Sequence, residues 1–408
     1  MGFVVVRPIP AAPLGRTVLR WYDDNNANTP RITRPARTYE VHLAGLKLEI
    51  VGLAWQQQDS AVGACATVAL WSLLHSSAFD EHHAIPTTAD LTRFANRTMS
   101  LGARVFPSDG LTVQQILEAI KQTGLAPVIV HGNQTGGPSD RVTFSRDRFS
   151  TSFASLVRAG FPVILTGRMG DGLHAVCAVG FRDVGASIAA PGMVSIQDET
   201  IQHIYVNDDN IGPNGRFRID EDPLTKTVSL VRDPPPARNS SAPTPSRQRT
   251  YPAFIPHGII AAVPETLRTS PLQLNEAGVR IGSLLATLLN QIAPPFGGAV
   301  GARFVKVSEY LGAILPDTIG RGSMRQQQVL SRVRIALTTD VNPLSLHIGL
   351  VRFSLAAIPI LDLVFDTSDS DRHLKPDCCV VFQPAVTQLL QAIQAAGLAN
   401  FGIQIDGF

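Results

Sequence analysis

The sequence predicts an α+β protein of two domains. The chain has 408 residues, enough for two domains of about 150 residues each. Helical periodicity and strand alternation both occur in each half of the chain. A stretch rich in proline and serine, residues 232–252, separates the halves and is typical of a linker. We therefore expect an irregular N-terminal arm over 1–45, a first domain over 46–231, and an α+β module of unknown role over 253–408.

The first domain is expected to begin with a strand pair and a buried helix. The segment "TYEVHLAGLKLEIVGLAW" predicts two short strands around "AGLK". A helix from Ala64 to about Ser76 has almost no polar face, which is typical of a helix buried in the middle of its domain. Two more helices are predicted in "PTTADLTRFANRTM" and "DGLTVQQILEAIKQTGLAP", where Gly124 would end the second.

A helix and a β-hairpin follow. The helix is expected over 152–159 and ends at Gly160. "VILTGR" then predicts a strand, "MGDG" a turn, and "LHAVCAVGFR" the returning strand. In the C-terminal module, helices are predicted in "NEAGVRIGSLLATLLNQI", "GARFVKVSEYLGAIL" and "QPAVTQLLQAIQAAGL", and strands in "SLHIGLVRFSL" and "ILDLVFDT".

Composition limits the class of function. The net charge is +2, the pI about 8.4 and the aromatic content 6%, a balance that favours neither nucleic acid nor an anionic membrane as a partner. No run of about 20 apolar residues exists, so we expect no membrane span. The cysteines, with no CxxC spacing, do not predict a disulfide scaffold or a zinc site; they are Cys65, Cys177, Cys378 and Cys379. Cysteine this scarce fits a reducing, cytoplasmic compartment.

Cys65 stands at the start of the predicted buried helix, in "WQQQDSAVGACATVALWSLL". Buried structural packing is one interpretation, because free cysteine behaves as a small hydrophobe. A nucleophile is the other, because the free N–H groups and the dipole of a helix N-terminus stabilise a thiolate. The N–H of Cys65 and the amide of a preceding glutamine could also donate to an oxyanion.

A base and a group that orients it are available further along the chain. His174 opens a strand directly after the Gly-rich turn, where it could be held rigidly, although a histidine at a surface turn is the simpler interpretation. Asn207, Asp208 and Asp209 end a short apolar strand. They could be ordinary turn residues, or one of them could accept a hydrogen bond from the His174 ring.

These residues occur in an order that resembles the papain-like cysteine peptidases. "GFPVILTGRMGDGLHAVCAVGF" is similar to the histidine-bearing stretch of the bacteriocin-processing branch of that family, and "IYVNDDNIGPNGRFRI" to papain's strand, turn and strand. The resemblance covers about residues 50–220. It implies a central helix packed on an antiparallel sheet, with Cys65 as nucleophile, His174 as base and Asp208 as its orienting partner.

The same resemblance implies that Gln58 helps to form the oxyanion hole. Gln58 lies seven residues before Cys65, whereas six is usual in the family and position 59 is aspartate, so Gln57 is the alternative. The 34-residue interval from His174 to Asp208 is also longer than the family norm, which implies an insertion.

The expected function is therefore cleavage of a peptide or isopeptide bond in a protein or peptide substrate. A transglutaminase, amidase or acyltransferase on the same fold is the first alternative, because the same three residues serve all these reactions. A non-enzymatic interaction protein on a decayed peptidase scaffold is the second. No cofactor and no metal are expected. The C-terminal half could bind a partner protein.

Overall fold

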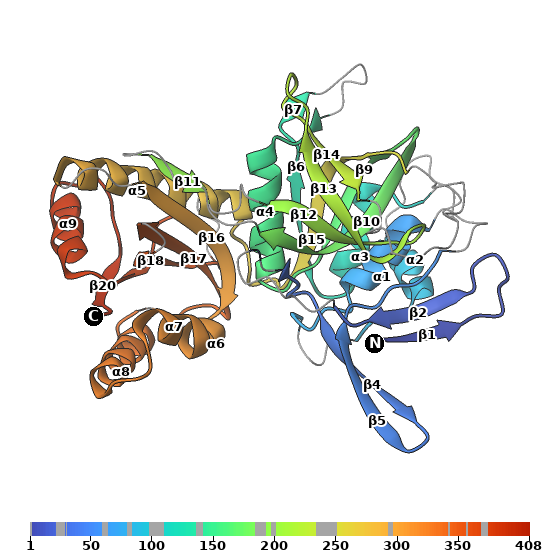
Figure 1. Ribbon diagram of the computed structural model, residues 1–408, viewed down its shortest axis with the longest axis horizontal. Coiled ribbons are helices and arrows are strands. Elements are labelled where there is room, and N and C mark those ends of the chain that lie inside the picture. Colours follow the sequence, from blue (N-terminus) through green and yellow to red (C-terminus); the bar gives the residue numbers. More distant parts are fainter. Residues whose placement is uncertain are drawn as a thin grey trace, which may run out of the picture. The chain divides into compact units, whose positions relative to one another are not determined.

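The computed structural model divides into two compact units (Figure 1). The described residues are 2–21, 29, 31–58, 64–79, 84–97, 110–135, 142–183, 193–196, 201–233, 251–292, 297–341, 343–355, 358–368 and 374–408. Unit 1 comprises residues 1–149, 160–183 and 201–263, and unit 2 comprises 150–159, 184–200 and 264–408. Both helices and strands are present in each unit, so the α+β class is confirmed.

An antiparallel sheet of eight strands dominates unit 1. Its strands are β3 (Arg31–Ile32), β6 (Ala126–His131), β9 (Val163–Met169), β10 (Gly172–Asp183), β12 (Ile201–Asp208), β13 (Gly212–Glu221), β14 (Val228–Arg232) and β15 (Phe254–Val263). Six of them follow the order β12-β13-β14-β15-β9-β10, and β10 pairs back onto β12. This last pairing closes the sheet into a six-stranded barrel.

The β9–β10 hairpin confirms the strand–turn–strand prediction. Met169 pairs with Gly172 across the turn, and Gly170 has a φ of 60°, which glycine adopts at no steric cost. The middle of β10, from Ala175 to Phe181, is wholly buried, as expected for a strand of a closed barrel whose other face is covered by a helix.

That covering helix is α1 (Cys65–Leu73), which packs against β9, β10 and β12. Every residue of α1 except Cys65 is buried, so the predicted all-apolar buried helix is confirmed. The other helices are α2 (Thr88–Ala95), α3 (Val113–Gln122) and α4 (Arg146–Arg158). Capping boxes at Thr87 and Thr112 begin α2 and α3. Helix α4 begins six residues earlier than the sequence predicts and crosses the boundary between the units.

The N-terminal segment forms two-stranded ribbons. β1 (Gly2–Val6) pairs with β2 (Leu14–Leu19), so the prediction of an irregular arm over 1–45 is wrong for these residues. The apolar alternation in each of these two strands is short and lies among several prolines, so the sequence pattern does not distinguish it from a loop. The predicted pair over 38–52 is confirmed as β4 (Arg37–Leu43) and β5 (Leu46–Gly52). A third ribbon joins β7 (Gln134–Thr135) to β8 (Val142–Thr143).

Unit 2 contains a mixed six-stranded sheet in the order β11-β16-β17-β18-β19-β20. The strands are β11 (Val194–Ile196), β16 (Gly298–Lys306), β17 (His347–Leu355), β18 (Ile358–Asp366), β19 (Cys378–Val381) and β20 (Ile403–Asp406). The outer pairs β11–β16 and β19–β20 are parallel, and the inner pairs are antiparallel. Strand β11, which lies between His174 and Asp208 in the sequence, is therefore an edge strand of the sheet of unit 2.

Helices cover both faces of this sheet (Figure 1). They are α5 (Pro271–Ile292), α6 (Val307–Glu309), a π-helical turn (Tyr310–Ile314), α7 (Leu315–Ile319), α8 (Met324–Thr339) and α9 (Pro384–Ala395). Gly278 and Gly282 let α5 approach β16 and β17 closely, because a Cβ at either position would lie under 3 Å from a valine side chain. Apolar residues of α8 pack with β17 and β18 in one core on the opposite face.

Two predictions about this half are wrong. The boundary at residue 253 is misplaced, because β15 pairs with β6, β9 and β14 inside the barrel of unit 1. The helix predicted over 301–315 is a strand up to Lys306, because its alternating residues pair with β17. Residues 234–250 of the predicted linker lie outside the described part of the chain. Among the described residues, no helix combines the length and hydropathy that a membrane crossing requires.

Candidate functional site

Cys65 is the first residue of α1, and its side chain is partly exposed. The N-cap residue, Ala64, has no side-chain group that could cap this helix end. The Gln58 Oε1 atom accepts a hydrogen bond from the Ala64 N–H at 3.2 Å, which places the glutamine amide beside the start of the helix. The free N–H groups of the first turn give this end of α1 a positive potential that favours an anion near the Cys65 sulfur.

His174 is held on β10 by the strands around it. It pairs with Gly167 of β9, and its ring lies edge-on to Phe254 of β15 at a centroid distance of 6.5 Å. A Cβ at position 167 would lie 2.2 Å from the Ile255 carbonyl oxygen. Glycine at this position therefore lets β15 approach β9 closely, and Phe254 reaches the imidazole as a result.

Asp208 is the last residue of β12, and several bonds fix its carboxylate and backbone. The Trp55 indole N–H donates to its carbonyl oxygen at 2.9 Å. The Asn210 N–H donates to its Oδ1 at 2.8 Å, which closes a tight turn after the strand. The remaining oxygen, Oδ2, is thereby directed at His174.

Two interactions link His174 to the other two residues. The His174 Nε2 atom lies 3.2 Å from Asp208 Oδ2, and an interaction with Cys65 is among the influences that raise the pKa of the ring. Because Nε2 faces the carboxylate, Nδ1 is the ring nitrogen left for the sulfur. Burial alone would lower the pKa of His174, but the hydrogen bonds with Asp208 and Cys65 and the nearby carboxylate charges raise it to about 10. The imidazole is therefore protonated at neutral pH.

Asn207 lies next to this group but is directed away from it. Its amide Nδ2 donates to Ser72 Oγ on α1 at 3.1 Å, and its Oδ1 accepts from the Asn214 N–H at 3.0 Å. These contacts tie α1 to the β12–β13 turn. Of the three residues that the sequence left open, Asp208 is the one that contacts the His174 ring at hydrogen-bond distance.

Asp209, which the sequence left open as an alternative to Asp208, also lies near the His174 ring. Its Oδ1 atom lies 3.6 Å from His174 Nε2, and its side chain is only 2% exposed. Neither of its carboxylate oxygens makes a hydrogen bond of normal geometry with the described residues. Burial raises the pKa of this carboxyl to about 6, against the opposing effect of the His174 charge. Strand alternation would turn Asp209 away from Asp208, and only the turn after β12 brings both to one ring.

The two glutamines before Cys65 have different partners. The Gln57 Oε1 atom accepts from the Leu14 N–H at 3.3 Å, and the Gln57 carbonyl accepts from Arg7. Gln57 is thus engaged with the β1–β2 ribbon, whereas Gln58 lies at the helix start. Asp59 and Gly63, which complete the sequence segment, lie outside the described residues.

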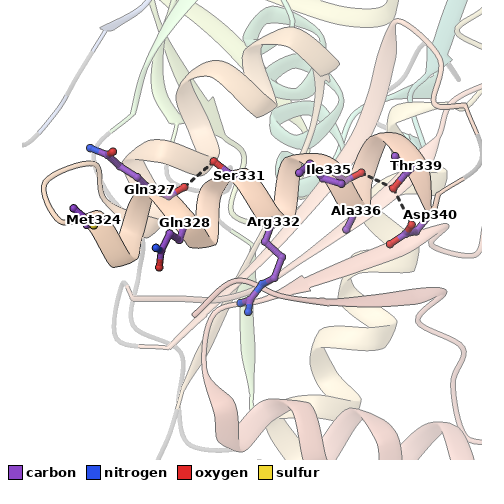
Figure 2. Close-up of a pocket in the computed structure, with 9 residues that line it drawn as sticks. All are labelled: Met324, Gln327, Gln328, Ser331, Arg332, Ile335, Ala336, Thr339 and Asp340. Atoms are coloured by element: carbon purple, nitrogen blue, oxygen red, sulfur yellow. Dashed lines mark hydrogen bonds between the residues drawn. The ribbon is translucent and has the colours of Figure 1, made fainter.

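A hollow lies in unit 2, along the exposed side of α8 (Figure 2). It has a volume of about 650 Å³ and is lined by residues from Met324 to Asp340. Its lining includes neither histidine nor cysteine, so it offers none of the groups that a thiol-based reaction needs.

No protein-family model matches this chain, and no curated protein matches it.

Proposed function

We propose that this chain is a cysteine peptidase with a Cys65–His174–Asp208 triad, and that unit 1 is a papain-like domain. The observation that carries the proposal is the contact of 3.2 Å between His174 Nε2 and Asp208 Oδ2, together with the interaction of Cys65 with the same ring, which helps to raise the pKa of His174. Nucleophile, base and orienting carboxylate are the three parts that thiol acyl transfer requires. The resemblance implies a central helix packed on an antiparallel sheet, and the packing of the buried helix α1 against β9, β10 and β12 supports that expectation.

In the proposed reaction, Cys65 attacks the substrate carbonyl as a thiolate. The carbonyl π electrons move to oxygen, and the resulting oxyanion accepts hydrogen bonds from the Cys65 N–H and the Gln58 amide NH₂. Gln58 suits this role because its Oε1 accepts a hydrogen bond from the Ala64 N–H at the start of α1, and its NH₂ group can act as a donor. His174 then donates its Nδ1 proton to the leaving amine as the C–N bond breaks.

The acyl-enzyme is released by water. His174, now neutral, takes a proton from water as its oxygen attacks the thioester carbonyl, and the thiolate leaves. Asp208 accepts from Nε2 throughout and fixes the ring so that Nδ1 faces the sulfur. If an amine replaced water, the same residues would perform acyl transfer, which is the transglutaminase or acyltransferase alternative.

The first test is the reactivity of Cys65 in the native chain. The other cysteines are fully buried, so iodoacetamide should modify Cys65 first, as located by mass spectrometry. His174→Ala should slow this alkylation by about tenfold or more, because the thiolate loses its positively charged partner. Cys177→Ala is the control and should leave the rate unchanged. Labelling of Cys378 before Cys65 would contradict the proposal.

The second test separates hydrolysis from transfer. The native chain is incubated with a peptide library, with and without an added primary amine, and products are identified by mass. A peptidase yields free carboxylates that require Cys65 and are lost in Cys65→Ala. Amine adducts as the main product would favour the transfer alternative. A reactive Cys65 with no product of either kind would favour a binding protein on a decayed scaffold.

A further inference from the structure

The surroundings of the His174 ring contain a second buried carboxylate, that of Asp209, which the proposed reaction does not use. Three potential metal ligands, His174, Asp208 and Asp209, place their donor atoms within 4.8 Å of one another. Asp208 and Asp209 approach the same ring nitrogen, Nε2, from the side opposite to the nitrogen that is left for Cys65. A triad needs only one of these two carboxylates.

Burial of the second carboxylate, that of Asp209, lowers the stability of the fold. The side chains of Asp208 and Asp209 are 0% and 2% exposed, so neither is solvated. A buried carboxylate without hydrogen bonds is strongly destabilising unless a cation compensates it. The oxygens of Asp209 lack such bonds among the described residues. The protonated His174 ring offsets one of the two negative charges. A divalent cation in place of the Nε2 proton would offset both.

The distances fit zinc. The His174 Nε2 atom lies 3.2 Å from Asp208 Oδ2 and 3.6 Å from Asp209 Oδ1. With zinc bonds of about 2.0–2.2 Å, neighbouring ligands of a tetrahedral site lie about 3.3–3.6 Å apart. One imidazole and two carboxylates is also a ligand set that suits zinc, whereas calcium and magnesium favour oxygen ligands alone.

We propose that His174 Nε2, Asp208 and Asp209 form a zinc-binding site whose occupancy does not require the Cys65 thiol. Zinc replaces the Nε2 proton, which is released to solvent, and the two carboxylates supply one oxygen each. The fourth position is open to a water molecule. Zinc binding does not depend on the proposed function, but in a peptidase it would take Asp208 from its orienting role and inhibit the reaction.

The test uses the full chain with Cys65→Ala, which removes the partly exposed thiol. Zinc chloride titrated by calorimetry should bind at one site per chain. X-ray absorption should show nitrogen or oxygen neighbours at about 2.0–2.1 Å and no sulfur at about 2.3 Å. Asp209→Asn, which keeps the side-chain shape, should weaken binding by at least about tenfold.

Asp233→Asn is the matched control. Asp233 lies 3.0 Å from His203 Nε2 in another partly buried His–Asp pair, where Arg216 takes the place of a second acid. Its substitution should leave zinc affinity unchanged. Equal affinities in the two variants, a sulfur neighbour in the Cys65→Ala chain, or no zinc binding by that chain would overturn the proposal. The absorption spectrum of the Cys65→Ala chain decides the ligand set even if Asp209→Asn fails to fold.

Discussion

At the scale of single residues, adjacent positions in "VNDDN" serve different purposes. Asn207 ties α1 to the β12–β13 turn through Ser72 and the Asn214 N–H, whereas Asp208 contacts His174. Position in the strand cannot separate these roles, because each side chain offers oxygen acceptors. Substitutions at the two positions should therefore affect different measured properties.

Asp208→Ala should slow alkylation of Cys65 by about tenfold or more, because the His174 ring loses the acceptor that fixes it. Asn207→Ala should instead lower the free energy of unfolding by about 1–3 kcal/mol, because buried polar groups lose their partners. Alkylation kinetics and urea denaturation measure the two effects. Asp208→Asn should be milder than Asp208→Ala, since an amide oxygen still accepts from the ring. A slower alkylation in Asn207→Ala than in Asp208→Ala would reverse the assignment.

His75 provides a prediction about pH. It is 2% exposed, its Nδ1 lies 2.9 Å from the Tyr39 hydroxyl, and its Nε2 has no hydrogen-bond partner among the described residues. Burial, together with the charges of Arg16 and Arg37, lowers the pKa of His75 to about 3. In the unfolded chain this histidine becomes protonated below about pH 6.5. In the folded chain it stays neutral until the pH falls to about 3.

His75 should therefore reduce the free energy of unfolding as pH falls from about 6.5 towards 3, by up to about 1.4 kcal/mol per pH unit. His75→Gln should flatten this slope, although it could lower stability at every pH. His42→Gln, at an exposed position of β4, is the control and should leave the slope unchanged. Denaturant titrations at several pH values give the slopes. Parallel slopes for wild type and His75→Gln would contradict this account.

At the scale of elements, β15 is central to the barrel although it follows the proline-rich stretch. It pairs along one edge with β9 and along the other with β6, and it touches β14 at Phe254. Phe254 also faces the His174 ring. The strand is therefore part of the structure that positions the candidate site.

A chain truncated after Arg232 should fail to fold as unit 1. Loss of β15 opens the barrel and leaves the backbone groups of β9 and β6 without their partners, at a cost that marginal stability cannot absorb. The fragment should be insoluble or should lack protected amides in hydrogen exchange. The full chain is the control. A soluble 1–232 fragment with native Cys65 reactivity would show that β15 is dispensable.

Gly167 tests the close approach of β9 and β15. Gly167→Ala places a Cβ 2.2 Å from the Ile255 carbonyl oxygen, so the strands must separate. The expected cost is about 1–3 kcal/mol of unfolding free energy, with slower alkylation of Cys65 because β10 moves with β9. Gly172→Ala in the same hairpin meets only Met169 O at 3.9 Å and should change little. Thermal melts compare the two, and equal stabilities would contradict the steric argument.

At the scale of the whole molecule, the chain leaves unit 1 and returns to it twice. Residues 150–159 and 184–200 belong to unit 2, although the segments on either side of each belong to unit 1. Each unit nevertheless has its own sheet and its own buried core. Unit 2 also contains a partly buried ion pair, in which Arg352 donates two hydrogen bonds of 2.7 Å to the fully buried Asp362.

Asp362→Ala should destabilise unit 2 by about 3–5 kcal/mol, because Arg352 and the Tyr310 hydroxyl lose their buried acceptor. Asp317→Ala removes an exposed pair with Arg321 and should change stability by less than about 1 kcal/mol. Cys65 alkylation should stay at the native rate in both variants below the unfolding transition. Calorimetry measures the transitions, and an equal effect of the two substitutions would contradict the burial argument.

The sequence by itself determined the local features that depend on neighbouring residues. The apolar run after Cys65 predicted a buried helix, because a helix without a polar face has no side that is suited to contact water. The Gly-rich turn at 169–172 specified the β9–β10 hairpin. Residue type, position and resemblance identified the candidate site residues, which are Cys65, His174, Asp208 and Gln58.

The tertiary structure alone decided what depends on pairing between distant segments. The apolar alternation of β15 fits any sheet edge, so its membership in the barrel is fixed by the register with β6 and β9 rather than by its own residues. The same holds for β11, whose three residues join a sheet more than 100 positions away. Asp209 approaches His174 because a turn overrides the alternation of β12. The backbone path through a turn depends on the bonds around it, which a linear pattern does not contain.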